Sequence, residues 1–140
     1  MKHLITARDL HINVNTEKGL FLWFLASFLF GKRIQEQVAQ RTYEAFVKHH
    51  LTDPKRIHSK SWQQLVDILG EGHYRRYDES TARYLLDWSQ QLIDEYGGRI
   101  KTVAKQSESR KDFCKRLEAF KGVGPKTVEI FMREAGPALF

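Results

Sequence analysis

The sequence is poor in cysteine and proline, with one cysteine, Cys114, and three prolines in 140 residues. One thiol excludes an internal disulfide framework, a Cys-based zinc site and a four-thiolate iron–sulfur cluster within these residues, and it fits a reducing compartment. The longest apolar run, Leu20 to Phe30, has only eleven residues. As a helix with a rise of ~1.5 Å per residue, it covers about half of a bilayer core. It begins too late for a signal peptide and lacks a small-residue cleavage site, so we expect a cytoplasmic protein.

Acidic residues are fewer than basic ones, with 17 Asp and Glu against 23 Lys and Arg and a net charge of +6. One segment carries the whole excess. Between Arg99 and Lys126, nine basic residues stand against three acidic ones, a difference of +6, and the rest of the chain is balanced at 14 against 14. A localised basic segment is typical of proteins that bind polyanions, although an ordinary solvated surface has the same composition.

Glycine, proline and small polar residues divide the chain into segments with a helical period, and few segments alternate as strands do. With 41% hydrophobic and 29% charged residues, the chain is expected to form a folded core. We predict one all-α domain over residues 1–140, with about seven helices and short connections. The predicted helices cover about 17–30 (buried on nearly all sides), 33–50, a short turn or helix from 54, 61–69, 78–96, 109–119 and 125–135. Residues 1–16 are compatible with a short extended arm, and residues 99–106 form a short basic piece.

Two glycines and a proline lie close together near the end of the sequence, in the segment Leu117-Glu118-Ala119-Phe120-Lys121-Gly122-Val123-Gly124-Pro125-Lys126-Thr127. This pattern predicts a helix, a tight turn and a second helix. Gly122 and Gly124 permit backbone geometry that other residues rarely adopt, and Pro125 suits the first position of a helix. Some backbone N–H groups of the turn then have no acceptor inside the protein, and we call these open N–H groups. They form a binding site for one phosphate, with Lys121 and Lys126 beside it.

The segment resembles the helix–hairpin–helix motif of DNA repair and replication proteins, here at about 109–135. The helices expected within 20–47 and the tripeptide Gly72-His73-Tyr74 extend the similarity. Over about residues 19–135 the chain resembles the endonuclease III-like superfamily of helix–hairpin–helix DNA glycosylases. This resemblance implies an endonuclease III-like fold, double-stranded DNA as the partner, and a role in base-excision repair.

The resemblance also implies which residues contact DNA. In the hairpin they are Lys121, Gly122, Val123, Gly124, Lys126 and Thr127. A second group comes from one loop and comprises His73, Tyr74, Arg75 and Arg76. The two arginines are expected to hold phosphates, and His73 or Tyr74 to stack in the gap left by a flipped base.

Each of these assignments has an alternative. Tyr74 or Tyr77 is equally compatible with a place in the core. Lys32 and Arg33 fall where the resemblance implies another residue that fills the gap in the duplex. The alternative is that they lie in solvent at the start of a helix. The histidines lack the spacing of a metal site, and no metal is expected apart from a monovalent cation that the resemblance implies on carbonyls of the hairpin, here those of Glu118, Phe120 and Val123.

Lys126 stands where bifunctional members of the superfamily have the lysine that attacks C1′ of the sugar. Such an amine must lose its proton, which a partly buried site beside Lys121 favours. The alternative is that Lys126 only contacts a phosphate. No aspartate follows Lys126, although the resemblance implies an essential one there. The sequence therefore leaves three functions open: a glycosylase or lyase that depends on Lys126, a non-catalytic DNA-binding module, and a helical protein-interaction domain.

Overall fold

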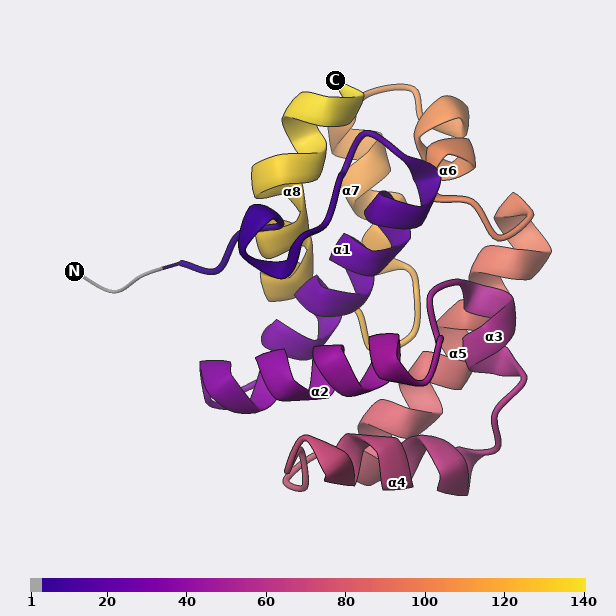
Figure 1. The fold of residues 1–140 in the computed structure, drawn as a ribbon. Helices are drawn as coiled ribbons and strands as arrows, with labels where there is room; N and C mark the ends of the chain where they lie inside the picture. Colours follow the sequence, from indigo (N-terminus) through magenta and orange to yellow (C-terminus); the bar gives the residue numbers. More distant parts are fainter. Residues whose placement is uncertain (1–3) are drawn as a thin grey trace.

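The computed structural model describes residues 4–140, and within this range the chain forms helices without any strand (Figure 1). In chain order the elements are the 3-10 helix η1 (Arg8–Leu10) and the helices α1 (Glu17–Phe30), α2 (Glu36–Lys48), α3 (Pro54–His58), α4 (Trp62–Glu71), α5 (Asp78–Tyr96), α6 (Ile100–Gln106), α7 (Arg110–Glu118) and α8 (Pro125–Leu139). The all-α prediction is confirmed. The described range holds eight α-helices instead of about seven because the basic piece at 99–106 forms a helix of its own.

Four helices begin where the sequence offers a capping side chain. Thr16, Asp53, Ser61 and Ser109 each accept a hydrogen bond from the backbone N–H three residues further along. Such bonds satisfy N–H groups that have no partner inside the helix. The structure therefore confirms the starts of α1, α3, α4 and α7 that the local sequence predicts.

Helix α1 lies at the centre of the fold and packs against α2, α6 and α8 (Figure 1). Its residues from Gly19 to Leu29 are buried except for Leu22, as predicted. The Phe24 ring meets Trp88 of α5 and Phe131 of α8 edge-on, with centroids 5.0 and 5.3 Å apart. Edge-to-face pairs add to the stability that burial alone provides. This aromatic cluster joins helices from both halves of the chain.

Helix α6 depends on a contact that is distant in sequence. It has seven residues, and its N-cap Arg99 provides no side-chain bond. Instead, the carboxylate of Glu17 accepts the N–H groups of Ile100 at 2.7 Å and of Lys101 at 2.9 Å. A carboxylate at a helix N-terminus is favoured by the helix dipole as well. Nothing local to residues 99–106 signals this helix.

Helix α8 is longer than predicted. The sequence suggests an end near Ala135 because Gly136 and Pro137 follow, yet α8 continues to Leu139. Proline removes one backbone donor, but the N–H of Phe140 still donates to the Gly136 carbonyl at 2.8 Å. Helix α8 packs against α1 and α7, and beside its last turn the Phe140 ring lies 5.4 Å from the ring of Phe113 in α7.

The N-terminal segment is not a free extended arm. From residue 4 it includes η1, and Ala7, Leu10 and Ile12 are buried against the core. The N–H of Ala7 donates to the carboxylate of Glu134 in α8. Across the residues that the structure describes, no helix has the length and apolarity that crossing a membrane requires.

We expect Phe24→Ala to destabilise the protein by about 3–5 kcal/mol, because a fully buried ring leaves a cavity in the aromatic cluster. Urea denaturation followed by circular dichroism measures this change. Leu4→Ala serves as the control, since Leu4 is 57% exposed and its removal should change the stability by less than about 0.5 kcal/mol. A loss of less than about 1 kcal/mol in Phe24→Ala would show that the cluster does not organise the core.

Candidate nucleic-acid interface

The connection between α7 and α8 forms the tight hairpin that the glycines predict. Gly122 has φ +78°, a left-handed conformation, and Gly124 is the N-cap of α8 with φ −107°. Pro125 occupies the first turn of α8. Within residues 4–140, the backbone N–H groups of Gly122, Gly124, Lys126 and Thr127 find no hydrogen-bond acceptor. An array of open N–H groups at a helix N-terminus is suited to an anion.

The aromatic cluster anchors the hairpin from the inside. Phe120, the third residue before Val123, is 3% exposed and meets the rings of Phe24 and Tyr96 at 6.2 and 5.9 Å. The side chain of Val123 is also buried, as predicted. The turn is therefore fixed to the core on one side while its open N–H groups remain available.

Helix α5 holds the hairpin through residues that the sequence analysis missed. The Gln91 side chain accepts the N–H of Lys121 at 2.8 Å and donates to the Ala119 carbonyl at 3.4 Å. The Tyr84 ring lies so close to Gly122 that a Cβ there would come within 2.4 Å of ring atom Cγ. Tyr84 and Gln91 are seven residues apart and share a helix face. That spacing was readable from the sequence, but nothing in it indicated which segment this face contacts.

The end of α1 contacts the other side of the hairpin. A Cβ at Gly31 would lie 2.3 Å from the Thr127 hydroxyl oxygen, so the two backbones approach as closely as glycine allows. Thr127 is 3% exposed, and its side chain is therefore an internal contact. Its backbone N–H finds no acceptor among the described residues, but the residue as a whole is buried.

Lys121 and Lys126 both lie on the surface beside the turn. The Lys126 side chain is 61% exposed, and its amine is 3.9 Å from the Glu129 carboxylate. Lys126 therefore does not occupy the partly buried site that the attacking role favours. The cause is its place in the first turn of α8, from which the side chain points into solvent, away from the aromatic cluster.

Val123 does not fit the predicted contact with DNA. Its N–H donates to the Phe120 carbonyl at 3.1 Å, and its side chain is buried. The predicted monovalent cation is compatible with the hairpin, because the carbonyls of Glu118 and Val123 receive no backbone donor within the described range. The Phe120 carbonyl keeps a second lone pair.

The second candidate surface, the loop at 72–77, has one predicted contact inside the protein. Tyr74 is completely buried, and its hydroxyl donates to the Leu29 carbonyl at 3.4 Å. Burial raises the pKa of this phenol. The predicted stacking of Tyr74 on DNA is therefore wrong in this conformation, and the alternative that it belongs to the core is confirmed.

The other three predicted contacts of this loop are exposed. His73, Arg75 and Arg76 all lie on the surface. The Arg76 guanidinium lies 5.3 Å from the ring centroid of Tyr77. Tyr74 ties this loop to Leu29, and Thr127 ties the hairpin to Gly31. Both candidate surfaces thus adjoin the C-terminal end of α1.

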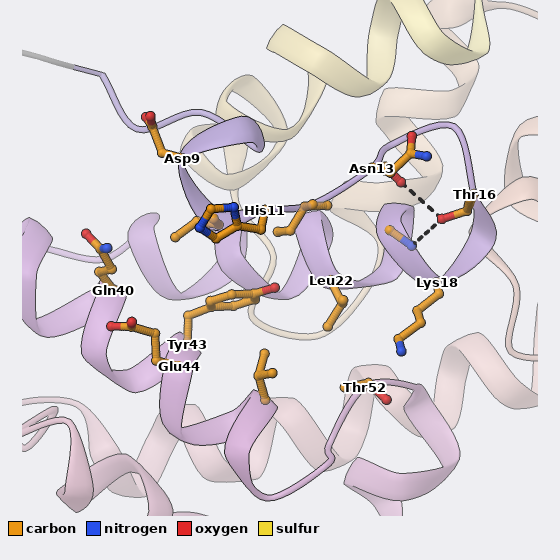
Figure 2. A pocket seen from close by; sticks show the side chains of 14 residues that line it. Asp9, His11, Asn13, Thr16, Lys18, Leu22, Gln40, Tyr43, Glu44 and Thr52 are labelled. Carbon is orange, nitrogen blue, oxygen red and sulfur yellow. Dashed lines mark hydrogen bonds between the residues drawn. The ribbon is translucent and has the colours of Figure 1, made fainter.

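A cleft of about 600 Å³ lies at the opposite end of α1. It separates the N-terminal segment from α1 and α2, and Figure 2 shows His11 and Tyr43 facing each other across it. Burial raises the pKa of the Tyr43 phenol to about 12. Thr16, Lys18 and Gly19 line this cleft at the first turn of α1, so the cleft is separate from the hairpin.

No family model, no curated protein and no solved structure matches this chain. Within the part of the chain that the structure describes, no three His, Cys, Asp or Glu residues gather as they would around a metal ion. The function therefore has to be argued from the hairpin itself.

The two hairpin glycines should respond differently to alanine. Gly122→Ala places a Cβ against Tyr84 at φ +78°, and we expect a loss of stability on the order of 1–3 kcal/mol from backbone strain alone. Gly124→Ala meets no heavy atom within 4 Å and should lose only the N-cap preference of glycine over alanine, less than about 1 kcal/mol. Thermal and urea denaturation compare the two variants. Equal stabilities would contradict the described turn geometry.

Proposed function

We propose that this protein binds double-stranded DNA without sequence preference, through the hairpin between α7 and α8, on an endonuclease III-like helical fold. The observation that carries the proposal is the group of four open N–H groups at Gly122, Gly124, Lys126 and Thr127. They lie at the positive end of a helix of fifteen residues, where partial charge and donor geometry both favour a phosphate.

The charges around the hairpin support a polyanionic partner. Lys121 and Lys126 flank the open N–H groups, and both side chains are exposed. Arg75 and Arg76 supply further cations on the loop that adjoins the same end of α1. Backbone N–H groups and lysines contact the sugar–phosphate backbone and not the bases, so the binding should not depend on the DNA sequence.

A role for Lys126 as the attacking amine has less support than DNA binding. Its side chain is exposed, and Glu129 lies at 3.9 Å. The amine therefore lacks the partly buried site that the attacking role favours. Phosphate contact is therefore the role that we propose for Lys126.

We expect the affinity for duplex DNA to fall steeply with salt, because bound phosphates release counterions. The test is fluorescence anisotropy with a short labelled duplex between about 50 and 200 mM salt. The double variant Lys121→Gln/Lys126→Gln should bind more weakly and reduce the slope of log K against log salt by about 1.8, at about 0.9 for each lost phosphate contact.

The matched control is Lys48→Gln/Lys55→Gln, which removes the same charge from two exposed lysines on α2 and α3. It should leave the slope unchanged if the hairpin makes the contacts. If the two double variants changed the slope equally, the binding would be general electrostatic attraction and not contact at the hairpin. Undetectable binding at the lowest salt would overturn the proposal and favour a helical protein-interaction domain.

A further inference from the structure

The cleft at the N-terminal end of α1 is built from three parts of the chain. Residues 9–13 form one wall, α2 forms the opposite wall, and the first turns of α1 contribute Lys18, Gly19 and Leu22 (Figure 2). At about 600 Å³, the cleft has the size of sites that bind small molecules in proteins. The DNA contact that we propose at the hairpin does not use it.

Helix α2 turns one face toward this cleft. Four of its residues line the cleft at spacings of three and four, which places them on one side of the helix: Gln40, Tyr43, Glu44 and Val47. Val47 is 38% exposed, and Leu22 of α1 is partly exposed. The N-terminal wall adds the apolar side chains of Leu10 and Ile12. Apolar surface is therefore available to the body of a ligand.

The N-terminal wall is held in place by α1. The Thr16 hydroxyl donates to the Asn13 carbonyl at 3.0 Å and accepts the N–H of Gly19 at 2.9 Å (Figure 2). A Cβ at Gly19 would lie 1.6 Å from the Asn13 carbonyl oxygen, so the two backbones approach as closely as glycine allows. A cleft that is formed before a ligand arrives requires little ordering on binding.

The Tyr43 hydroxyl is a polar group without a partner in this cleft. The residue is only 4% exposed, and within residues 4–140 its hydroxyl forms no hydrogen bond. Unlike the hydroxyls of Thr81 and Ser89, it is not sealed inside the core; Figure 2 shows it pointing into the cleft. Buried polar groups usually have a partner, so this hydroxyl is suited to a ligand. Burial raises the pKa of the phenol to about 12, which keeps it a neutral donor.

The charges that line the cleft are separated along it. Lys18 is exposed and, among the described residues, forms no ion pair. In Figure 2 its side chain extends toward Thr52 at one end, while Asp9 and Glu44 lie at the other end. The Tyr43 hydroxyl points toward the end that holds Lys18. An anionic group of a ligand is therefore favoured at the Lys18 end.

We propose that this cleft binds a small carboxylic acid with an apolar body. The Tyr43 hydroxyl and the Lys18 amine donate to the carboxylate, whose two oxygens can accept from both. The body of the ligand contacts Leu22, Val47 and the apolar side chains of the N-terminal wall. The site lies at the other end of α1 from the hairpin and gives the protein a second ligand besides DNA.

The test is an NMR titration of the isotope-labelled full chain with two acids, cinnamate, which is flat, and octanoate, which is flexible. We expect at least one of them to shift the amide signals of Lys18, Leu22, Tyr43 and Val47. The shifts should saturate with a dissociation constant of about 1 mM or tighter, as for other ligands of this size. The acid that binds more tightly shows whether the body of the ligand is flat or flexible.

Two substitutions test the two donors. Tyr43→Phe keeps the ring and should weaken the binding about two- to tenfold, the range for one neutral hydrogen bond. Lys18→Gln should weaken it about two- to fivefold and abolish the preference for cinnamate over the uncharged cinnamamide. The matched controls are Tyr77→Phe, outside the cleft, and Lys105→Gln, on an exposed site of α6. Both should leave the affinity unchanged.

Three results would overturn the inference. The first is the absence of saturating shifts with either acid. The second is a set of shifts at Gly122, Gly124 and Thr127 with the cleft unchanged, because the carboxylate would then occupy the hairpin. The third is equal binding of cinnamate and cinnamamide, or an unchanged affinity in Tyr43→Phe. Mapping the shifts on wild-type protein keeps the test decisive if Tyr43→Phe folds poorly.

Discussion

The packing of α1 against the aromatic residues of α5 and α8 is the constraint on which the other features depend. Phe24 contacts Trp88 and Phe131, and it also contacts Phe120 at the start of the hairpin. The cluster that stabilises the fold therefore positions the hairpin too. A turn that is fixed before it meets a ligand loses little conformational entropy on binding. The open N–H groups thus belong to a turn that the core already holds in place before a ligand binds.

Local signals in the sequence were enough to predict most helices and the hairpin. Thr16, Asp53, Ser61 and Ser109 cap their own helices, and Gly122 takes the left-handed conformation that only glycine adopts easily. The features that were missed depend on distant partners. Helix α6 begins on the Glu17 carboxylate, α8 passes Pro137 because its last turn packs on neighbouring helices, and the loop at 72–77 is fixed by the contact of Tyr74 with Leu29. A single sequence does not reveal such contacts.

The candidate site was predicted in its backbone but not in its side chains. The spacing of Gly122, Gly124 and Pro125 indicated the open N–H groups, whereas the role of Lys126 was left open between an attacking amine and a phosphate contact. In the structure Lys32 is half-buried beside two aromatic rings, while the Lys126 side chain is exposed. Burial depends on which elements come together, so a single sequence does not show which lysine is desolvated.

The central claim is that the open N–H groups of the hairpin bind the phosphate backbone of duplex DNA. The most direct measurement is an NMR titration of isotope-labelled protein with a short duplex, in which each backbone amide reports its own surroundings. The account predicts that the amide signals of Gly122, Gly124, Lys126 and Thr127 shift first and furthest. Shifts confined to the opposite end of α1, around His11 and Tyr43, with the hairpin amides unchanged, would contradict it.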